Sequence, residues 1–371
     1  MTKLSDVFVL QMGKTPARAK NAYWNDGSNQ WVSISDLSGF DKYVGTTKET
    51  ITDLAVSESG IKIVPENTVI MSFKLTLGKT AITQKPVYTN EAIMAFIPTG
   101  KYEIDTNYFY HLFSGRDWSK GTNRAVMGVT LNKATLGEIE IDIPPLCEQT
   151  EIADKLDKVD ALIADRITQL EKLDSLVKSR FIELFGDPNT NPMKWKKEQL
   201  QINATLLNGR AYKQDELLDD GKYPVLRVGN FFSNRGWYYS DLELDEDKYC
   251  DDGDLLYAWS ASFGPRIWNG GKVIYHYHIW KVLVGEKYNK QFLCHLLDYA
   301  TASFMGDTHG IGMMHLTKSG MEETEFIVPP IDLQNQFTAF VEQTDKSKLV
   351  IQQSLEKLET LKKSLMQQYF G

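Results

Sequence analysis

Two stretches of the sequence are near copies of each other. Residues 144–186 read PPLCEQTEIADKLDKVDALIADRITQLEKLDSLVKSRFIELFG, and residues 329–371 read PPIDLQNQFTAFVEQTDKSKLVIQQSLEKLETLKKSLMQQYFG. They align without a gap at an offset of 185 residues and share both prolines, the block Leu-Glu-Lys-Leu at 170–173 and 355–358, and the final Phe-Gly. Because twice 185 is 370 and the chain has 371 residues, the chain consists of two copies of one unit.

Each copy predicts one long amphipathic helix. The double proline can open a helix but cannot continue one, and the final glycine is typical of a helix end. Between them, apolar residues recur with heptad spacing, which favours a helix that packs against another helix. The residues of this stripe, our candidate helix–helix interface, are Leu156, Val159, Ile163, Leu170, Leu173, Val177 and Leu184 in the first copy and Val341, Ile351, Leu355, Leu358, Leu365 and Tyr369 in the second.

Charged residues interrupt both stripes: Arg166 and Arg180 in the first copy, Lys348 and Lys362 in the second. We expect their stems to snorkel or their charges to meet carboxylates of a partner helix. Two arrangements remain open, a mutual antiparallel pair or two helices that each pack on their own domain. The pair is favoured because the first helix leaves unit one for unit two and the second can return. About 38 residues at ~1.5 Å each make a rod of roughly 57 Å.

The remainder of each unit has the pattern of a mixed globule. Strand-like runs at 68–71 and 272–275 accompany helical stretches at 108–114 and 290–302. We therefore expect an α+β fold with two tandem globules and a pair of coiled-coil-like helices. The expected order is a first globule over 1–143, a helix over 144–186, a linker and second globule over 187–328, and a second helix over 329–371.

The composition excludes several classes of protein. The 41 Lys and Arg residues against 49 Asp and Glu give a formal net charge of −8, which argues against a uniformly basic DNA-coating protein. No apolar run approaches the roughly 18 residues that span a bilayer, and the N-terminus lacks the apolar stretch of a secretory signal. The cysteines, Cys147, Cys250 and Cys294, form neither a CxxC pair nor an even disulfide set. These features predict a reduced, cytoplasmic protein without a membrane segment.

Two segments, residues 72–90 and 255–285, contain basic, hydroxyl and aromatic residues without any carboxylate. Ser72 and Trp259 lie 187 positions apart, so the segments hold nearly equivalent places in the repeat. Such a composition suits contacts with a phosphate backbone and with base edges. The alternative is a central pair of strands whose aromatic residues form the core, with lysines at the rim.

A second candidate surface combines the basic stretch at 116–124 with the loop at 308–310, side chains that also occur in ordinary solvated loops. The candidate DNA-contacting residues of both surfaces are Lys74, Lys79, Lys85, Arg116, Lys120, Asn123, Arg124, Ser260, Ser262, Arg266, Lys272 and His309.

The sequence offers no catalytic or metal-binding constellation. It has no Gly-rich GKS/T loop, and GIGMMH at 310–315 is a poor dinucleotide fingerprint. His276 and His278 would share one face of a strand, but no Asp, Glu or Cys lies nearby in sequence to complete a metal site, so structural roles are favoured. Asn-Pro-Met at 191–193 lacks the second proline and the aromatic residue of the adenine methyltransferase signature. We therefore expect a binding protein with no catalytic residue and no metal.

Two variable globules, each followed by a repeated helix that ends in Phe-Gly, resemble the specificity (S) subunit of type I restriction–modification enzymes. The resemblance covers the whole chain. It is carried by Pro-Pro-Leu at 144–146 with Glu-Gln at 148–149, by LEKLDSLVKSRFIELFGDP, by LNKATLGEIEIDIPP and GIGMMHLTKSGMEETEFIVPP, and by the opening MGKTPARAKNAYWNDGSNQWVSISDLSG. In the second helix, Leu-Gln-Asn-Gln at 333–336 departs from the Glu-Gln pair of the first.

The resemblance implies a DNA-binding subunit with two target-recognition domains separated by an antiparallel helix pair. Each globule would read one half of a split DNA site, mainly in the major groove. The helices would set the spacer and dock two adenine methyltransferase subunits, with two restriction–translocase subunits as optional further partners. S-adenosylmethionine, ATP and Mg²⁺ would then belong to those partners. Because recognition domains vary within the family, no base-contacting residue transfers by motif.

Two other functions fit the same sequence. A stand-alone bipartite DNA-binding regulator would have the same basic segments without a methyltransferase partner, and its purified chain would bind DNA specifically by itself. A duplicated hydrolase or nuclease would show turnover with Mg²⁺, but the missing carboxylate clusters argue against it.

Overall fold

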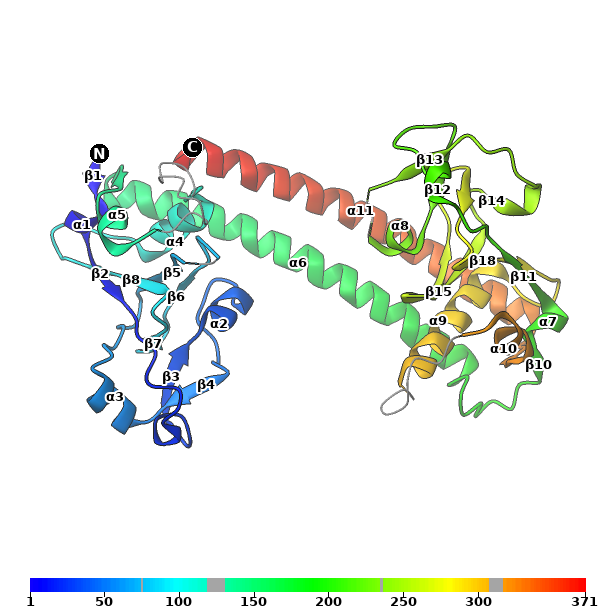
Figure 1. The fold of residues 1–371 in the computed structure, drawn as a ribbon, viewed down its shortest axis with the longest axis horizontal. Helices are drawn as coiled ribbons and strands as arrows, with labels where there is room; N and C mark the ends of the chain where they lie inside the picture. The colour runs from blue at the N-terminus through cyan, green and yellow to red at the C-terminus, as the bar shows by residue number, and fades with distance from the viewer. Residues whose placement is uncertain (75, 119–130, 234–235, 307–315) are drawn as a thin grey trace. The chain divides into compact units, whose positions relative to one another are not determined.

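The computed structural model describes residues 1–74, 76–118, 131–233, 236–306 and 316–371 and forms two compact units (Figure 1). Unit 1 contains Met1–Thr168 and Gln352–Gly371, and unit 2 contains Gln169–Ile351. The two long helices, α6 over Leu146–Phe185 and α11 over Ile331–Phe370, therefore each contribute one part to either unit.

Both units are built from closely similar series of short elements, with α3 present in unit 1 and β14 in unit 2. In unit 1 these are β1 (Thr2–Lys3), α1 (Leu4–Val7), β2 (Phe8–Met12), β3 (Asn29–Val32), α2 (Ile34–Gly39), β4 (Glu49–Ile51), α3 (Asp53–Ser59), β5 (Val69–Ser72), β6 (Thr80–Ile82), β7 (Tyr88–Thr89), β8 (Ile93–Pro98), α4 (Thr106–Gly115), α5 (Lys133–Gly137) and β9 (Glu140–Ile141). In unit 2 they are β10 (Lys197–Gln199), α7 (Leu200–Asn203), β11 (Ala204–Asn208), β12 (Tyr223–Leu226), α8 (Val228–Ser233), β13 (Tyr238–Ser240), β14 (Tyr249–Cys250), β15 (Leu255–Ser260), β16 (Ser262–Ile267), β17 (Val273–Tyr275), β18 (Ile279–Val284), α9 (Lys290–Gly306), α10 (Lys318–Glu323) and β19 (Glu325–Ile327). The expected strands at 68–71 and 272–275 and the expected helices at 108–114 and 290–302 are confirmed as β5, β17, α4 and α9.

The main sheet of each unit has the same topology. Its strand order is β2-β8-β5-β6 in unit 1 and β11-β18-β15-β16 in unit 2, with all neighbours antiparallel. Ser72 lies opposite Ile93, and Ala258 lies opposite Ile279, so Trp259 corresponds to Phe73. The expectation that Ser72 and Trp259 hold nearly equivalent places is confirmed to within one residue.

A second sheet and a two-stranded ribbon also recur. The second sheet has the order β4-β3-β7 in unit 1 and β13-β12-β17-β14 in unit 2, with parallel pairing of β3 with β7 and of β12 with β17. The ribbons β1-β9 and β10-β19 pair the first strand of each unit with the strand just before its long helix. The expected α+β class is confirmed, since helices and largely antiparallel sheets make up the described part of the chain.

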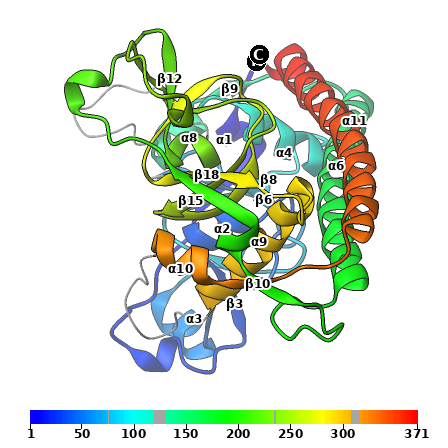
Figure 2. The same cartoon turned by 90° about the vertical axis from the view of Figure 1, so that its right-hand side faces the viewer.

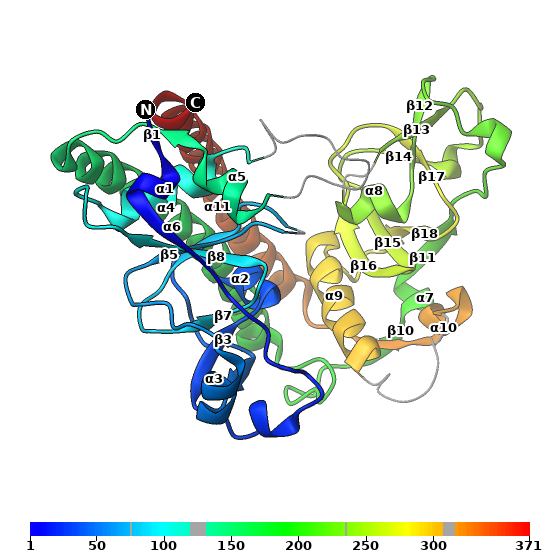
Figure 3. The same ribbon diagram turned by 60° about the vertical axis from the view of Figure 1, so that its left-hand side comes forward.

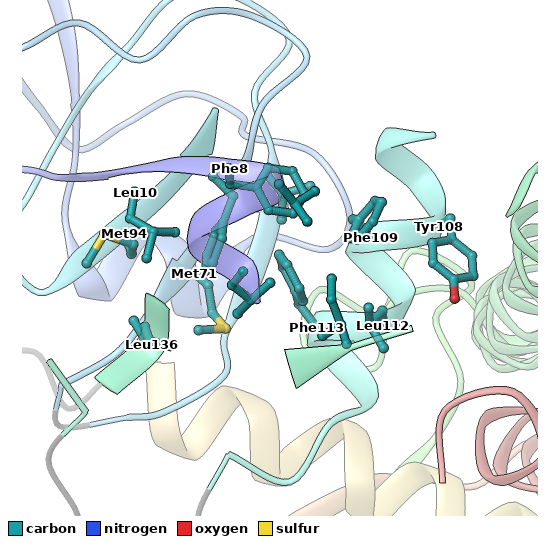
Figure 4. Packing of buried hydrophobic residues seen from close by; sticks show 14 of the residues in the cluster. Phe8, Leu10, Met71, Met94, Tyr108, Phe109, Leu112, Phe113 and Leu136 are labelled. Carbon is teal, nitrogen blue, oxygen red and sulfur yellow. The ribbon is translucent and has the colours of Figure 1, made fainter. Parts of the chain in front are cut away.

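One helix covers each main sheet and closes its core. In unit 1, Phe109 and Phe113 of α4 pack against aromatic rings of the sheet, with ring-centroid distances of 5.0 Å from Phe109 to Phe8 and 4.5 Å from Phe113 to Phe96 (Figure 4). In unit 2, α9 lies along β15 and β16 (Figure 3). Burying such aromatic side chains supplies much of the stability of a small core.

The long helices α6 and α11 run antiparallel and side by side (Figure 2). In unit 1, the ammonium of Lys362 lies 2.5 Å from the carboxylate of Asp160. In unit 2, the ammonium of Lys348 lies 2.6 Å from the carboxylate of Asp174. Asp160 comes before Asp174 along α6, but the partner of Asp160, Lys362, comes after the partner of Asp174, Lys348, along α11. The two helices therefore run in opposite directions, which confirms the antiparallel pair. The expectation that the interrupting lysines meet carboxylates of the partner helix is confirmed as well.

The predicted heptad stripe lies at the contact between the helices and at their contact with the globules. Its members Leu156, Val159, Val177, Val341 and Leu355 are buried. Leu156 belongs to the core of unit 1 and Val177 to the core of unit 2. The long helices therefore pack both on each other and on the globules, so the two arrangements that the sequence left open occur together. The remaining stripe residues are half-buried: Ile163, Leu170, Leu173, Leu184, Ile351, Leu358, Leu365 and Tyr369.

Candidate nucleic-acid interface

The β5–β6 hairpin of unit 1 brings two predicted basic residues together. Lys74 and Lys79 lie in its turn, where Gly78 adopts a positive φ of 80° and donates its N–H to the Ser72 carbonyl at 2.9 Å. The Ser72 hydroxyl also accepts the N–H of Lys79 at 3.0 Å. Lys85 follows the other end of β6, so the structure separates it from this pair.

The second predicted surface is only partly described. Arg116 follows α4 and lies over the ring of Trp118, with its guanidinium carbon 5.6 Å from the ring centroid. Burial lowers the pKa of this guanidinium. The other members, Lys120, Asn123, Arg124 and His309, lie outside the described residues.

Of the candidate DNA-contacting residues in unit 2, two lie at a hairpin tip and two are cations packed against other side chains or backbone. Ser260 and Ser262 pair across the tip of β15 and β16, and Ala261 between them has a φ of 63°, in the left-handed region. Arg266 donates a hydrogen bond of 2.5 Å to the carbonyl of Phe231. Lys272 has its ammonium 4.6 Å from the ring centroid of Tyr249.

The carboxylate-free segment of unit 2 is largely core, as the alternative interpretation held. Tyr257 and Trp280 are buried, and the stack of Tyr257, Trp280 and Trp259 has centroid distances of 5.8 and 5.7 Å. Trp259 is half-buried, and the turns at 259–262 and 276–278 reach the surface. The strands of this segment therefore serve folding, and its turns remain available for binding.

At the end of the main sheet of unit 2, two backbone segments cross at close range. Gly209, just after β11, lies against the end of β17, and a Cβ on Gly209 would lie 2.4 Å from the carbonyl oxygens of Tyr275 and His276. The N–H of Arg210 donates to the Tyr275 carbonyl at 3.0 Å. We call residues 209–211 and 275–278 the Gly209 crossing.

Unit 1 has the same crossing at the same end of its sheet. A Cβ on Gly13 would lie 2.2 Å from the carbonyl oxygen of Thr89, and the N–H of Lys14 donates to that carbonyl at 2.8 Å. We call residues 13–15 and 89–92 the Gly13 crossing. Only glycine fits at either position, because any side chain would overlap a backbone carbonyl.

The side chains at the Gly209 crossing are aromatic and held in place. The indole N–H of Trp259 donates to the Tyr277 carbonyl at 2.9 Å, and its backbone N–H donates to the His278 carbonyl at 3.0 Å. The guanidinium of Arg210 is engaged by both carboxylate oxygens of Glu216, at 2.7 and 2.9 Å. Tyr277 itself is 39% exposed.

Burial favours the neutral form of both histidines of this crossing. Burial, with His278 and Arg227 adding to it, lowers the pKa of His276 to about 4. Burial lowers the pKa of His278 as well. A neutral imidazole offers one hydrogen-bond donor and one acceptor, which a protonated ring does not. A cavity of about 400 Å³ opens beside Gly209 and Tyr277 of the crossing, and Trp259 also lines it.

Two buried glutamines hold the long helices onto the globules, a role that the sequence comparison did not assign. The amide of Gln149 in α6 donates to the carbonyls of Glu103 and Pro144 at 3.1 and 2.9 Å. Its oxygen accepts the N–H of Asp105, the N-cap of α4, at 2.9 Å. The available signal was the identity of Gln149 and Gln334 between the repeats.

Gln334 repeats this pattern in unit 2. Its amide donates to the carbonyls of Lys287 and Pro329 at 2.9 and 2.8 Å, and its oxygen accepts the N–H of Asn289 at 2.8 Å. The exposed fractions of Gln149 and Gln334 are 1% and 0%. The two clamps therefore fix each globule to a helix in the same way.

Neither a metal centre nor a membrane span is found in the described part of the chain. Across residues 1–74, 76–118, 131–233, 236–306 and 316–371, no group of three or more His, Cys, Asp or Glu side chains could hold a metal ion. Over the same residues, no helix combines the length and apolar character that crossing a membrane requires. His276 and His278 instead pack on each other, with ring centroids 4.7 Å apart.

Two repeated α+β units on an antiparallel helix pair define a duplicated binding protein with two corresponding surfaces. A family model described as the type I restriction modification DNA specificity domain matches the chain twice, over residues 1–172 and 192–360. The chain belongs to this family, and as a specificity subunit it carries two target-recognition domains. The resemblance drawn from the sequence is thereby confirmed.

Individual relatives agree with this assignment. The chain is 24% identical to the type I restriction enzyme MjaIX specificity subunit of Methanocaldococcus jannaschii, over 92% of this chain and 85% of the relative. It is 30% identical to the EcoR124I/EcoR124II specificity subunit of Escherichia coli, over 40% of this chain and 38% of the relative.

Two solved structures share the fold across the whole chain. One is the S subunit of a type I restriction–modification system from M. genitalium, with a TM-score of 0.58 at 15% identity and coverage of 100% of this chain and 95% of that chain. The other comes from a study of complex assembly and conformational transition of the type I R-M system, with a TM-score of 0.63 at 14% identity and coverage of 100% and 96%.

Proposed function

We propose that the chain selects the DNA sites of a type I restriction–modification complex, with each unit reading one half of a split site. The repeat carries this proposal. Two units with one topology but with different side chains on corresponding surface loops suit two half-sites of different sequence. The partners are then double-stranded DNA and the other subunits of the system.

The helix pair offers corresponding sites for two like partners. Leu176 of α6 and Leu361 of α11 occupy the same place in the repeat, 185 residues apart, and they are 48% and 45% exposed. Two copies of one subunit need two copies of one docking surface. We assign these surfaces to two adenine methyltransferase subunits. S-adenosylmethionine, ATP and Mg²⁺ would be bound by the methyltransferase and restriction subunits, so catalysis lies with the partners.

The helices also set the distance between the half-sites. Inserting one heptad after Thr168 and another after Ile351 lengthens each helix between the part that belongs to unit 1 and the part that belongs to unit 2. Seven helical residues add ~10 Å, which corresponds to about three base pairs at ~3.4 Å each. The methylated motif of this variant should contain a spacer longer by about that amount, and an unchanged spacer would contradict the ruler role.

The central experiment maps modified adenines across the host genome with and without the gene. We expect deletion to remove a split, gapped methylated motif, whose two halves and spacer the map then reveals. An unchanged map contradicts the proposal. If the purified chain then binds DNA specifically without partners, the stand-alone regulator is the better description.

A further inference from the structure

Both units present one end of their main sheet as a surface of fixed backbone. At this end the turn that follows β5 or β15 lies next to the start of β8 or β18 and to the end of β2 or β11. The glycines Gly13 and Gly209 hold the crossing segments so close that no other residue fits. The backbone of the two crossings therefore corresponds, whatever side chains it carries.

The side chains on this shared backbone differ in kind. By strand register, Asn90, Glu91 and Ala92 of unit 1 correspond to His276, Tyr277 and His278 of unit 2, because Ile93 and Ile279 begin equivalent strands. Glu91 is exposed and accepts a hydrogen bond from the hydroxyl of Thr15. One crossing thus carries a carboxylate acceptor, and the other carries neutral rings with donors and acceptors.

The chemistry of the Gly209 crossing suits base edges better than phosphates. Its cation, Arg210, is held by Glu216 in a two-point ion pair. Tyr277 and His278 present neutral hydrogen-bonding groups, and the hydroxyls of Ser260 and Ser262 stand at the hairpin tip of the same sheet end. Neutral donors and acceptors gain little from a phosphate, but they can discriminate between bases in the major groove.

A rigid support holds these groups in place. Trp259 donates two hydrogen bonds to the backbone of the 277–278 turn and stacks on the buried ring of Trp280. Ordered side chains lose less entropy on binding, which sharpens discrimination. The backbone strain of Ala261, a non-glycine residue in the left-handed region, lies at the same tip.

We propose that Tyr277 and His278, with Ser260 and Ser262 beside them, are the residues by which unit 2 reads the bases of its half-site, and that Glu91 at the Gly13 crossing has this role in unit 1. The inference rests on the DNA-recognition function proposed above. It deepens that function by assigning specificity to one end of each main sheet.

The test uses the complete complex in a host without other adenine methylation. Tyr277→Ala and His278→Ala should relax or change one half of the methylated motif while the other half and the spacer stay as they are. Glu91→Ala should change the opposite half. Each lost base contact should reduce the preference for the correct base by roughly 10-fold to 100-fold. Tyr102→Ala, a tyrosine of the same 39% exposure, is the matched control and should change neither half.

A second pair of variants tests the same proposal if the alanine variants fail to assemble into the complex. Tyr277→Phe and His278→Gln keep the size of each side chain, and the purified complex is measured against duplexes with single base changes in each half-site. Unchanged discrimination overturns the assignment, as does a change in the same half by both Tyr277→Ala and Glu91→Ala. A wild-type complex that gives no split motif at all contradicts the proposed function instead.

Discussion

Unit 1 and unit 2 share their strand order, their crossing glycines and their glutamine clamps, but they differ in the side chains on the exposed turns. The shared glutamines are buried, and the shared glycines lie so close to another backbone segment that no other residue type fits. At the crossings the side chains differ where they are exposed, as with Glu91 in unit 1 and Tyr277 in unit 2. The comparison shows that the two copies share their sheet topology and the contacts that hold it, and that they differ in the exposed side chains available for binding.

The units also differ where the globule meets the helices. In unit 1, Asp157 of α6 accepts hydrogen bonds from Lys42 at 2.6 Å and is bonded to His111 of α4 at 2.7 Å. The corresponding residue of unit 2, Glu342, is exposed. A cavity of about 610 Å³, lined in part by His295, opens in unit 2 at the matching junction. Among the described residues, the ion pair between globule and helix at this junction is therefore found in unit 1.

The glutamine clamps should give the largest effect and should give it equally in both units. Gln149→Met and Gln334→Met each remove three buried hydrogen bonds and leave their backbone partners unsatisfied, so we expect the free energy of unfolding to fall by about 2–4 kcal/mol. Urea denaturation measures this. The exposed Gln353→Met is the control. If one of the two variants lost much of its free energy of unfolding and the other lost none, the two glutamine clamps would not be equivalent.

The ionic network should give a smaller effect, confined to unit 1. Asp157→Asn weakens the charge-assisted bonds from Lys42 and His111, and we expect it to cost about 1–2 kcal/mol. The matched variant Glu342→Gln should stay within about 0.5 kcal/mol of wild type, because its side chain is exposed. Thermal unfolding of the two variants measures this difference. Equal losses of stability in Asp157→Asn and Glu342→Gln would show that the junctions between globule and helix are alike in the two units.

The hairpin turns should differ in how strongly salt affects DNA binding. Lys74→Ala combined with Lys79→Ala removes two cations from one turn, so we expect about tenfold weaker binding and a salt slope reduced by about 2. Ser260→Ala combined with Ser262→Ala should leave the slope unchanged, because hydroxyls release no counterions. Titrations of the complex at several salt concentrations measure both. An unchanged slope in the lysine variant would place those lysines away from the phosphates.

The smallest effect concerns pH and should again be alike in the two units. Burial lowers the pKa of His111 in α4 and of His295 in α9 below the ordinary value of 6.5, against the opposing pull of nearby carboxylates. The unfolded chain then binds protons more readily, so stability should fall as pH drops from about 7 to 5. His111→Gln and His295→Gln should each flatten this fall by up to about 1 kcal/mol. A fall in stability that is as steep in either variant as in the wild-type chain would mean that the replaced ring does not titrate in this range.

Much of the fold could be predicted because its signals are local. The heptad stripe, the proline and glycine boundaries and the gapless offset of 185 residues indicate two long helices and a duplicated unit without any knowledge of contacts. The strands at 68–71 and 272–275 were predicted correctly for the same reason. Of the candidate binding residues, the structure gathers Lys74 with Lys79 and Ser260 with Ser262, and it gives Arg116, Arg266 and Lys272 packing contacts.

The sequence alone thus determined the repeat, the two long helices and the family resemblance, since each depends on the order of residues along the chain. Only the tertiary structure identified the crossings, because Gly13 and Gly209 lie 196 positions apart while the helices repeat at 185. Loops of different length separate these glycines from the helices, so no alignment at one offset pairs them. The partners of Asp157 were hidden for the same physical reason: Lys42 lies 115 residues away and is brought close only when the globule packs on α6.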